Sequence, residues 1–101
     1  MKKKNLEDEF KVLRIIKNKP SSSQRELAKD LGYSLGKLNY CLNALVEKGF
    51  VKINNFNASK NKAGYIYVLT LRGLREKTKL TINFMKRKMN EYEELNKELK
   101  E

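Results

Sequence analysis

The stretch that decides the fold is residues 23–49, which read SQRELAKDLGYSLGKLNYCLNALVEKG. It opens with a capping box, because Ser23 can cap a helix and Glu26 follows three residues later. A short helix follows and ends at Gly32, where the chain needs a left-handed backbone. Ser34 can then cap a second helix after a break of two residues. Two short helices joined by a tight turn that contains a glycine predict a helix-turn-helix.

The segments on both sides extend this pattern. Residues 6–18 carry apolar side chains at helical spacing, which predicts a helix that stops before Pro20. Residues 50–56 and 65–69 are typical of strands, and the polar, basic residues 57–64 between them are typical of a loop. The sequence therefore predicts a helix before the helix-turn-helix and a β-hairpin after it.

The last third of the chain, from Leu71 onward, again has a helical pattern. The predicted order is α-α-α-β-β-α, a mainly helical α+β fold with a small hairpin. We therefore expect a winged helix-turn-helix domain over residues 1–70 and a long C-terminal dimerisation helix over residues 71–101.

The apolar positions of the helices predict the core. In the first helix and in the second helix of the helix-turn-helix, the residues expected to face inward are Leu6, Phe10, Leu13 and Ile16, and Leu35, Leu38, Leu42 and Leu45.

Charge indicates a polyanionic partner. The chain has 23 Lys and Arg against 12 acidic residues, a net charge of +11. Residues 1–79 hold 18 basic and 7 acidic side chains, which accounts for the whole excess, whereas residues 80–101 hold five of each. This distribution favours nucleic acid or an anionic surface as the partner of the N-terminal part. A soluble protein with many surface lysines is the alternative on composition alone.

Several classes of protein are excluded by missing residues. The purely apolar stretches are too short for a membrane span or a secretory segment, so we expect no membrane partner. The chain has no His and one cysteine, which leaves no Cys–His pair for catalysis and no usual cluster for a metal. We expect neither an enzyme nor a cofactor. Cys41 reads as a small buried hydrophobic residue, with a redox switch as the alternative, and a single cysteine fits a reducing cytoplasm.

The second helix of the helix-turn-helix is the element that would enter a DNA major groove. With its leucines turned inward, the residues left facing outward are Ser34, Gly36, Lys37, Asn39, Tyr40 and Asn43. Lysine can reach guanine acceptors or phosphate, asparagine can pair with adenine, and glycine permits close approach of the backbone. The alternative is an exposed polar face that binds nothing.

Two further groups would contact the DNA backbone. Gln24 and Arg25 lie at the exposed start of the preceding helix, a position that commonly holds phosphate. Lys60, Asn61 and Lys62 lie on the wing, where they could contact a minor groove or the adjacent backbone. A merely solvated hairpin would also carry a basic loop.

The C-terminal helix carries an apolar stripe with alternating spacings of three and four. We call this stripe the seam, and its members are Ile82, Met85, Met89, Tyr92, Asn96 and Leu99. Such a heptad pattern predicts pairing of two helices, and a polar residue such as Asn96 at a core position sets the register. Packing of the seam on its own domain is the alternative.

Three runs resemble one family: SQRELA at residues 23–28, LGYSLGKLNYCL at 31–42 and LVEKGFV at 45–51. They are similar to MarR-type winged-helix regulators. Together with FMKRK at residues 84–88 and EYEEL at 91–95, they resemble the short exopolysaccharide-associated members of that family. The resemblance implies control of genes for surface or extracellular polysaccharide. Standard MarR proteins carry extra helices that build a ligand pocket, whereas one long helix is expected here, so a small-molecule effector is doubtful.

We therefore predict a cytoplasmic homodimer that binds double-stranded DNA in a sequence-specific way and acts as a repressor. Two alternatives stay open at the level of sequence. One is a winged-helix module that binds protein or structured RNA, and the other is a nonspecific chromosome-binding protein.

Overall fold

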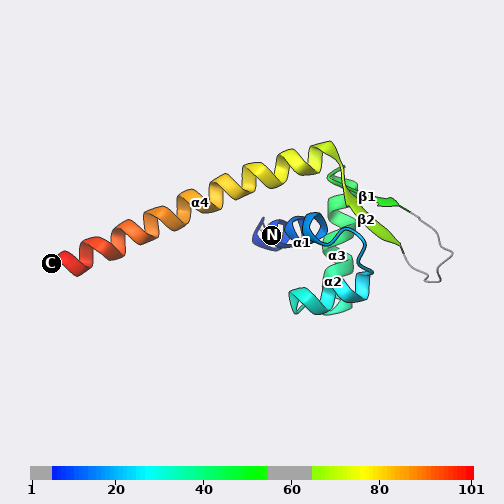
Figure 1. Ribbon diagram of the computed structural model, residues 1–101, viewed down its shortest axis with the longest axis horizontal. Coiled ribbons are helices and arrows are strands. Elements are labelled where there is room, and N and C mark those ends of the chain that lie inside the picture. Colours follow the sequence, from blue (N-terminus) through cyan, green and yellow to red (C-terminus); the bar gives the residue numbers. More distant parts are fainter. Residues whose placement is uncertain (1–5, 55–64) are drawn as a thin grey trace.

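The chain folds in the predicted order of elements (Figure 1). The computed structural model describes residues 6–54 and 65–101. The helices are α1 (Leu6–Asn18), α2 (Gln24–Leu31), α3 (Leu35–Glu47) and α4 (Leu71–Lys100). The strands are β1 (Val51–Asn54) and β2 (Ile66–Leu69). This arrangement confirms the winged helix-turn-helix architecture with a long last helix.

The predicted capping signals define both helices of the helix-turn-helix. The Ser23 hydroxyl accepts a hydrogen bond from the Glu26 amide, and the Glu26 carboxylate accepts one from the Ser23 amide. Gly32 closes α2 with a φ of 75°, in the left-handed region. The Ser34 hydroxyl then accepts from the Lys37 amide at the start of α3. The short turn is therefore bounded by hydrogen bonds that the local sequence specifies.

The two strands form an antiparallel hairpin. Val51 pairs with Leu69, and the register continues to Asn54 opposite Ile66. Val51 is buried against the helices, whereas Ile53 near the outer end of β1 is exposed. The predicted loop and the end of the first predicted strand, residues 55–64, lie outside the described residues.

The core lies where α1, α2 and α3 meet the hairpin. Its largest fully buried side chains come from the three helices and from β1: Val12, Leu13, Ile16, Leu27, Leu38, Leu42, Leu45 and Val51. Tyr67 of β2 and Leu80 of α4 complete the buried cluster. The burial of Leu80 shows that the beginning of α4 is part of this core.

Two leucines expected in the core are on the surface instead. Leu6 is 55% exposed and Leu35 is 45% exposed. Each is the first residue of its helix. Neither lies deep enough between the helices to be covered, although the spacing of both matches the buried stripe.

Helix α4 is continuous over 30 residues and crosses α1 before it projects from the domain (Figure 1). A Cβ at Gly73 would overlap the carbonyl oxygen of Phe50, so the glycine lets α4 lie directly against the chain that enters β1. The projecting part makes the molecule 62 Å long and 27 × 25 Å across. No helix in the described part of the chain is long and apolar enough to cross a membrane.

Candidate nucleic-acid interface

One side of α3 is exposed and polar while the other holds the core together. Leu38, Cys41, Leu42 and Leu45 are buried. The exposed residues between them are Gly36, Lys37, Asn39, Tyr40 and Asn43, which we call the outward face of α3. Tyr40 is 75% exposed, so most of its ring and its hydroxyl are open to solvent. The face therefore contains the polar residues that the sequence analysis expected there.

The outward face is tied to the start of α2 by one side-chain contact. The Gln24 amide nitrogen donates to the Asn39 side-chain oxygen at 3.1 Å. This bond joins the two helices of the motif across the turn, and it leaves the Asn39 amide group able to donate elsewhere. Two of the predicted site residues, far apart in the sequence, are thus brought together.

Lys37 is held differently from the other residues of this face. Its ammonium group lies 3.5 Å from the Asp8 carboxylate and 4.2 Å from the centre of the Tyr33 ring. The Tyr33 hydroxyl in turn donates to Asp8 at 2.6 Å. Lys37 was expected to point outward to DNA, but here it turns back to α1.

Asp8 is therefore the central acceptor of a three-residue cluster. The hydrogen bond from Tyr33, and then the positive charge of Lys37, hold the pKa of Asp8 below its usual value of 3.8. Burial, followed by the hydrogen bond to Asp8, raises the pKa of Tyr33 well above its ordinary 10.0. At neutral pH the cluster thus consists of a carboxylate, a neutral phenol and a lysine.

A second contact joins α1 to the far end of α3. The Lys48 ammonium group lies 2.5 Å from the Glu9 carboxylate, and the Glu9 side chain is largely buried. With the Asp8 cluster at one end and this pair at the other, α3 is attached to α1 at both of its ends. The outward face is therefore presented on a helix whose position is well determined.

The residues around the outward face add both signs of charge. Arg25 is exposed at the first turn of α2, and Lys52 is exposed on β1. Glu47 is exposed at the last turn of α3, and sequence analysis missed it although it follows Tyr40 and Asn43 at helical spacing. The predicted wing residues Lys60, Asn61 and Lys62 lie outside the described residues.

Comparison with known proteins identifies the domain. A family profile described as winged helix-turn-helix DNA-binding matches residues 9–52, from the first turn of α1 into β1. The chain carries a winged helix-turn-helix domain. No curated protein sequence matches the chain significantly.

Three solved structures have a fold similar to that of this chain. A mutant of MarR from E. coli, complexed with operator DNA, is 31% identical over 73% of this chain and 51% of its own, with a TM-score of 0.65. The transcriptional repressor CouR, bound to a 23-mer DNA duplex, is 22% identical over 91% of this chain and 63% of its own, with a TM-score of 0.78. The PcaV transcriptional regulator from Streptomyces coelicolor, in complex with its natural ligand, is 17% identical over 81% of this chain and 57% of its own, with a TM-score of 0.73.

The chain therefore has a fold similar to that of these three proteins over the aligned residues. The chain spans less than two thirds of the length of each of these structures. PcaV is named a transcriptional regulator and CouR a transcriptional repressor. Within residues 6–54 and 65–101, no group of three or more acidic or cysteine side chains could hold a metal ion.

The seam on α4 is exposed in the single chain. Its apolar members Ile82, Met85, Met89, Tyr92 and Leu99 are all exposed, from 47% at Ile82 to 84% at Leu99. Leu95, which the heptad pattern omitted, is exposed as well. The winged-helix domain leaves this surface exposed, and Phe84 is the last apolar residue of α4 that packs against the described core.

Proposed function

We propose that the chain is a MarR-type transcriptional regulator that binds double-stranded DNA with sequence preference as a homodimer. The observation that carries the proposal is the outward face of α3. It presents Asn39, Tyr40 and Asn43 on a helix that two sets of contacts attach to α1. Among the described residues, the side chains of Tyr40 and Asn43 make no hydrogen bond within the chain, so their polar atoms are available to bases and phosphates.

The remaining parts of the proposed interface have supporting roles. Arg25 would hold a phosphate beside the N-terminus of α2, and Ser34 and Gly36 would allow the start of α3 to approach the DNA closely. Lys37 would have to leave Asp8 in order to reach a guanine or a phosphate. The wing residues Lys60, Asn61 and Lys62 would contact the minor groove or the backbone next to it.

The finer parts of the proposal rest on resemblance. The runs at residues 84–88 and 91–95 resemble the exopolysaccharide-associated regulators, and we propose genes of that kind as targets and repression as the mode of action. CouR, one of the matched structures, is described as a repressor. A regulator of this kind would act in the cytoplasm.

Selection of bound duplexes from a random library, followed by binding titrations at several salt concentrations, tests the proposal. We expect one enriched, palindromic sequence motif. Asn39→Ala and Asn43→Ala should each reduce the preference for that motif by about tenfold or more, the value of one specific base contact. Lys37→Ala should also reduce the preference if its ammonium group reaches a base.

Arg25→Ala and Lys100→Ala serve as matched comparisons. Arg25→Ala should weaken binding to all duplexes. It should also reduce the slope of log affinity against log salt concentration by about one, as expected of a phosphate contact. Lys100→Ala, at the far end of α4, should change neither. Binding with steep salt dependence but no preferred sequence would instead indicate a nonspecific chromosome-binding protein, and no duplex binding would indicate an interaction module.

A further inference from the structure

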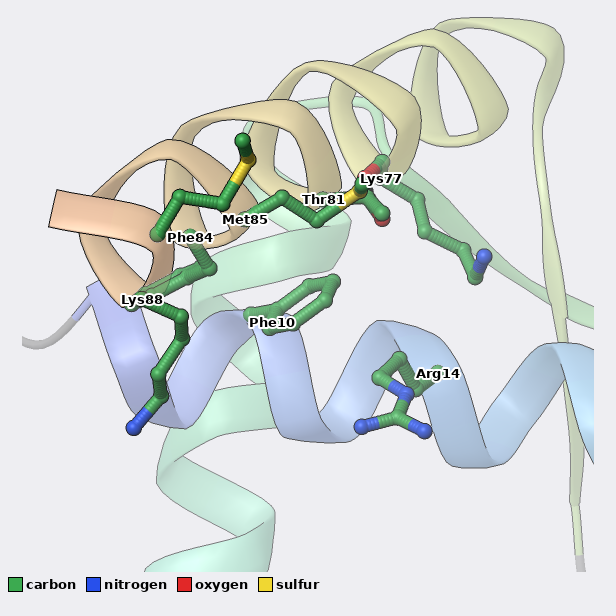
Figure 2. Close-up of a pocket in the computed structure, with 8 residues that line it drawn as sticks. Phe10, Arg14, Lys77, Thr81, Phe84, Met85 and Lys88 are labelled. Atoms are coloured by element: carbon green, nitrogen blue, oxygen red, sulfur yellow. Dashed lines mark hydrogen bonds between the residues drawn. The ribbon is translucent and has the colours of Figure 1, made fainter. Parts of the chain in front are cut away.

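A groove runs between α1 and α4, and its lining is apolar with a basic rim (Figure 2). Its volume is about 550 Å³. Phe10 of α1 and Phe84 of α4 stack across its floor, with ring centres 5.0 Å apart. The charged residues that line it are Arg14, Lys77 and Lys88, and all three are basic. An occupant should therefore combine apolar groups with negative charge.

The groove and the seam share two residues. Met85 and Met89 line the groove and are also members of the seam. A helix that packs on the seam would therefore lie along the open side of the groove, next to α1. The helix that covers the seam would therefore also place its side chains beside the basic residues at the rim of the groove.

The chain itself contains a segment with the required chemistry. Residues 91–101 of α4 carry five glutamates against two lysines, and they expose Tyr92, Leu95 and Leu99. Residues 85–90 carry Lys86, Arg87 and Lys88 and no acidic residue. Residues 91–101, which we call the acidic end of α4, are thus acidic and apolar. Residues 85–90, beside the groove, are basic and apolar.

We propose that the acidic end of α4 from a second copy of this chain fills the groove, with the two α4 helices antiparallel. This inference rests on the homodimer in the proposed function, and it adds the orientation and the surface that the partner helix covers. The seam members then match in pairs. Ile82 lies opposite Leu99, Met85 opposite Asn96 and Met89 opposite Tyr92, so that every seam residue meets another seam residue.

Charge favours the antiparallel orientation. Lys86 and Glu93 flank the seam on the same side, and in this register Lys86 of one protomer lies beside Glu93 of its partner, twice per dimer. The acidic end of the partner helix also approaches Arg14 and Lys77. A parallel pairing would set Lys86, Arg87 and Lys88 against their own copies and would leave the rim of the groove uncompensated. The one point in favour of the parallel pairing is that it would place the two copies of Asn96 opposite each other.

The register also gives a spacing that suits DNA. Leu80 marks the place where α4 is anchored in the core, and it lies level with Glu101 of the partner. The two Leu80 residues are then 21 positions apart along the helix pair, roughly 31 Å at about 1.5 Å per residue. This distance is of the same order as the ~34–36 Å between successive major grooves on one side of a duplex.

Disulfide trapping tests the orientation. In the antiparallel pairing, Met85→Cys together with Asn96→Cys should give a covalent dimer under mild oxidation. Neither single variant should, because two copies of residue 85 would lie about 16 Å apart along the axis. The unaltered chain, whose Cys41 is buried, is the control. Cross-linking by Met85→Cys alone would show a parallel pairing and overturn the inference.

Charge reversal is a second test and needs no cysteine. Lys86→Glu should weaken dimerisation about fivefold in sedimentation equilibrium, since two exposed ion pairs are lost, and adding Glu93→Lys should restore it. Lys52→Glu, the same charge change on the hairpin, should have no effect. Failure of Glu93→Lys to restore the dimer would contradict the antiparallel register.

The outcomes separate this inference from the proposed function. A parallel dimer that still selects a DNA motif would overturn the inference and leave the function intact. An antiparallel dimer that binds no duplex would support the inference and overturn the function. A chain that stays monomeric at all concentrations would overturn the inference and the dimeric part of the function, while the duplex titrations would still report DNA binding.

Discussion

At the scale of single residues, the cluster of Asp8, Tyr33 and Lys37 connects three segments of the domain. Asp8 on α1 accepts from Tyr33 in the turn and attracts Lys37 on α3, so three segments of the domain meet at one carboxylate. A lysine that would otherwise extend freely into solvent is thereby held at the edge of the outward face of α3. DNA phosphates would compete with Asp8 for this lysine.

Asp8→Asn should destabilise the domain at neutral pH and change its response to acid. The pKa of Asp8 is lowered on folding, so its contribution is complete above the unfolded value of 3.8 and is lost as the pH falls through the lowered folded value. We expect the variant to lose about 1.5–3 kcal/mol of unfolding free energy at pH 7, the value of a hydrogen bond to a charged group. The difference from the unaltered chain should shrink below pH 4.

Urea titrations at pH 7 and at pH 3 measure both effects. Tyr33→Phe should cost a similar amount at pH 7, and the double variant should cost less than the two single changes together, because both remove the same hydrogen bond. Equal losses for Asp8→Asn at the two pH values would contradict the assignment.

Gly73→Ala should destabilise the chain even though alanine favours helices. The added Cβ would overlap the carbonyl oxygen of Phe50, so α4 or the start of β1 would have to shift. We expect a loss of about 2 kcal/mol or more in thermal or urea unfolding, as for other overpacked sites. Gly36→Ala is the matched control. Its nearest neighbour is the Ser34 hydroxyl at 4.0 Å, so it should gain up to about 1 kcal/mol.

At the scale of elements, the boundaries of α2 and α3 are specified by two serine caps and one glycine. Ser23 and Ser34 each accept a hydrogen bond from the amide three residues ahead, and Gly32 lies between them in the left-handed region. These interactions are local, which is why the boundaries of both helices could be predicted from the sequence.

Ser23→Ala and Ser34→Ala should each cost about 1 kcal/mol of unfolding free energy, since each leaves helix amides without an acceptor. Ser34→Ala should in addition weaken DNA binding, because Ser34 begins the helix that carries the outward face. Ser21→Ala is a control for both, since Ser21 is exposed and caps no helix. Urea unfolding monitored by circular dichroism gives the stabilities, and no loss for Ser23→Ala would argue against the capping box.

At the scale of the whole molecule, α4 has two parts with different roles. As far as Phe84 it packs on the domain, with Leu80 buried and Phe84 stacked on Phe10. The outer part of α4 projects from the domain (Figure 1). The apolar side chains beyond Phe84 are exposed. A shortened chain must keep the first part if it is to test the second.

A chain that ends after Asn90 should remain folded and become monomeric. It retains Leu80 and Phe84 but loses Tyr92, Asn96 and Leu99, which form half of the seam. Sedimentation should report the mass of one chain, and the affinity for a palindromic duplex should fall at least about a hundredfold, because the second domain no longer binds with the first. A shortened chain that still sediments as a dimer would show that the seam does not pair the two copies.

Much of the fold follows from short-range signals, and the structure confirms these predictions. Helical spacing, the serine caps, Gly32 and the change of pattern after Gly49 predicted the order of all six elements. The same periodicity predicted most of the core. It failed at Leu6 and Leu35, because spacing indicates the direction in which a side chain points and not whether another element covers it.

The candidate site, like the fold, could be predicted from the sequence only in part. The outward face of α3 could be predicted, since it is what remains when the buried stripe of one helix is removed. The contacts of that face with other helices could not be predicted. Gln24 of α2 donates a hydrogen bond to Asn39 of α3, and Asp8 of α1 pairs with Lys37 of α3. No local pattern connects residues that lie 15 or 29 positions apart.

By itself, then, the sequence determined the elements, their boundaries and the polar face of the winged helix, because capping and periodicity act within a few residues of chain. The tertiary structure alone decided that Lys37 turns back to Asp8, that α4 is divided into an anchored and an exposed part, and that a basic groove lies beside the seam. These features depend on the angle at which α1 packs against α3 and α4. That angle is set by the shapes of many side chains packing at once.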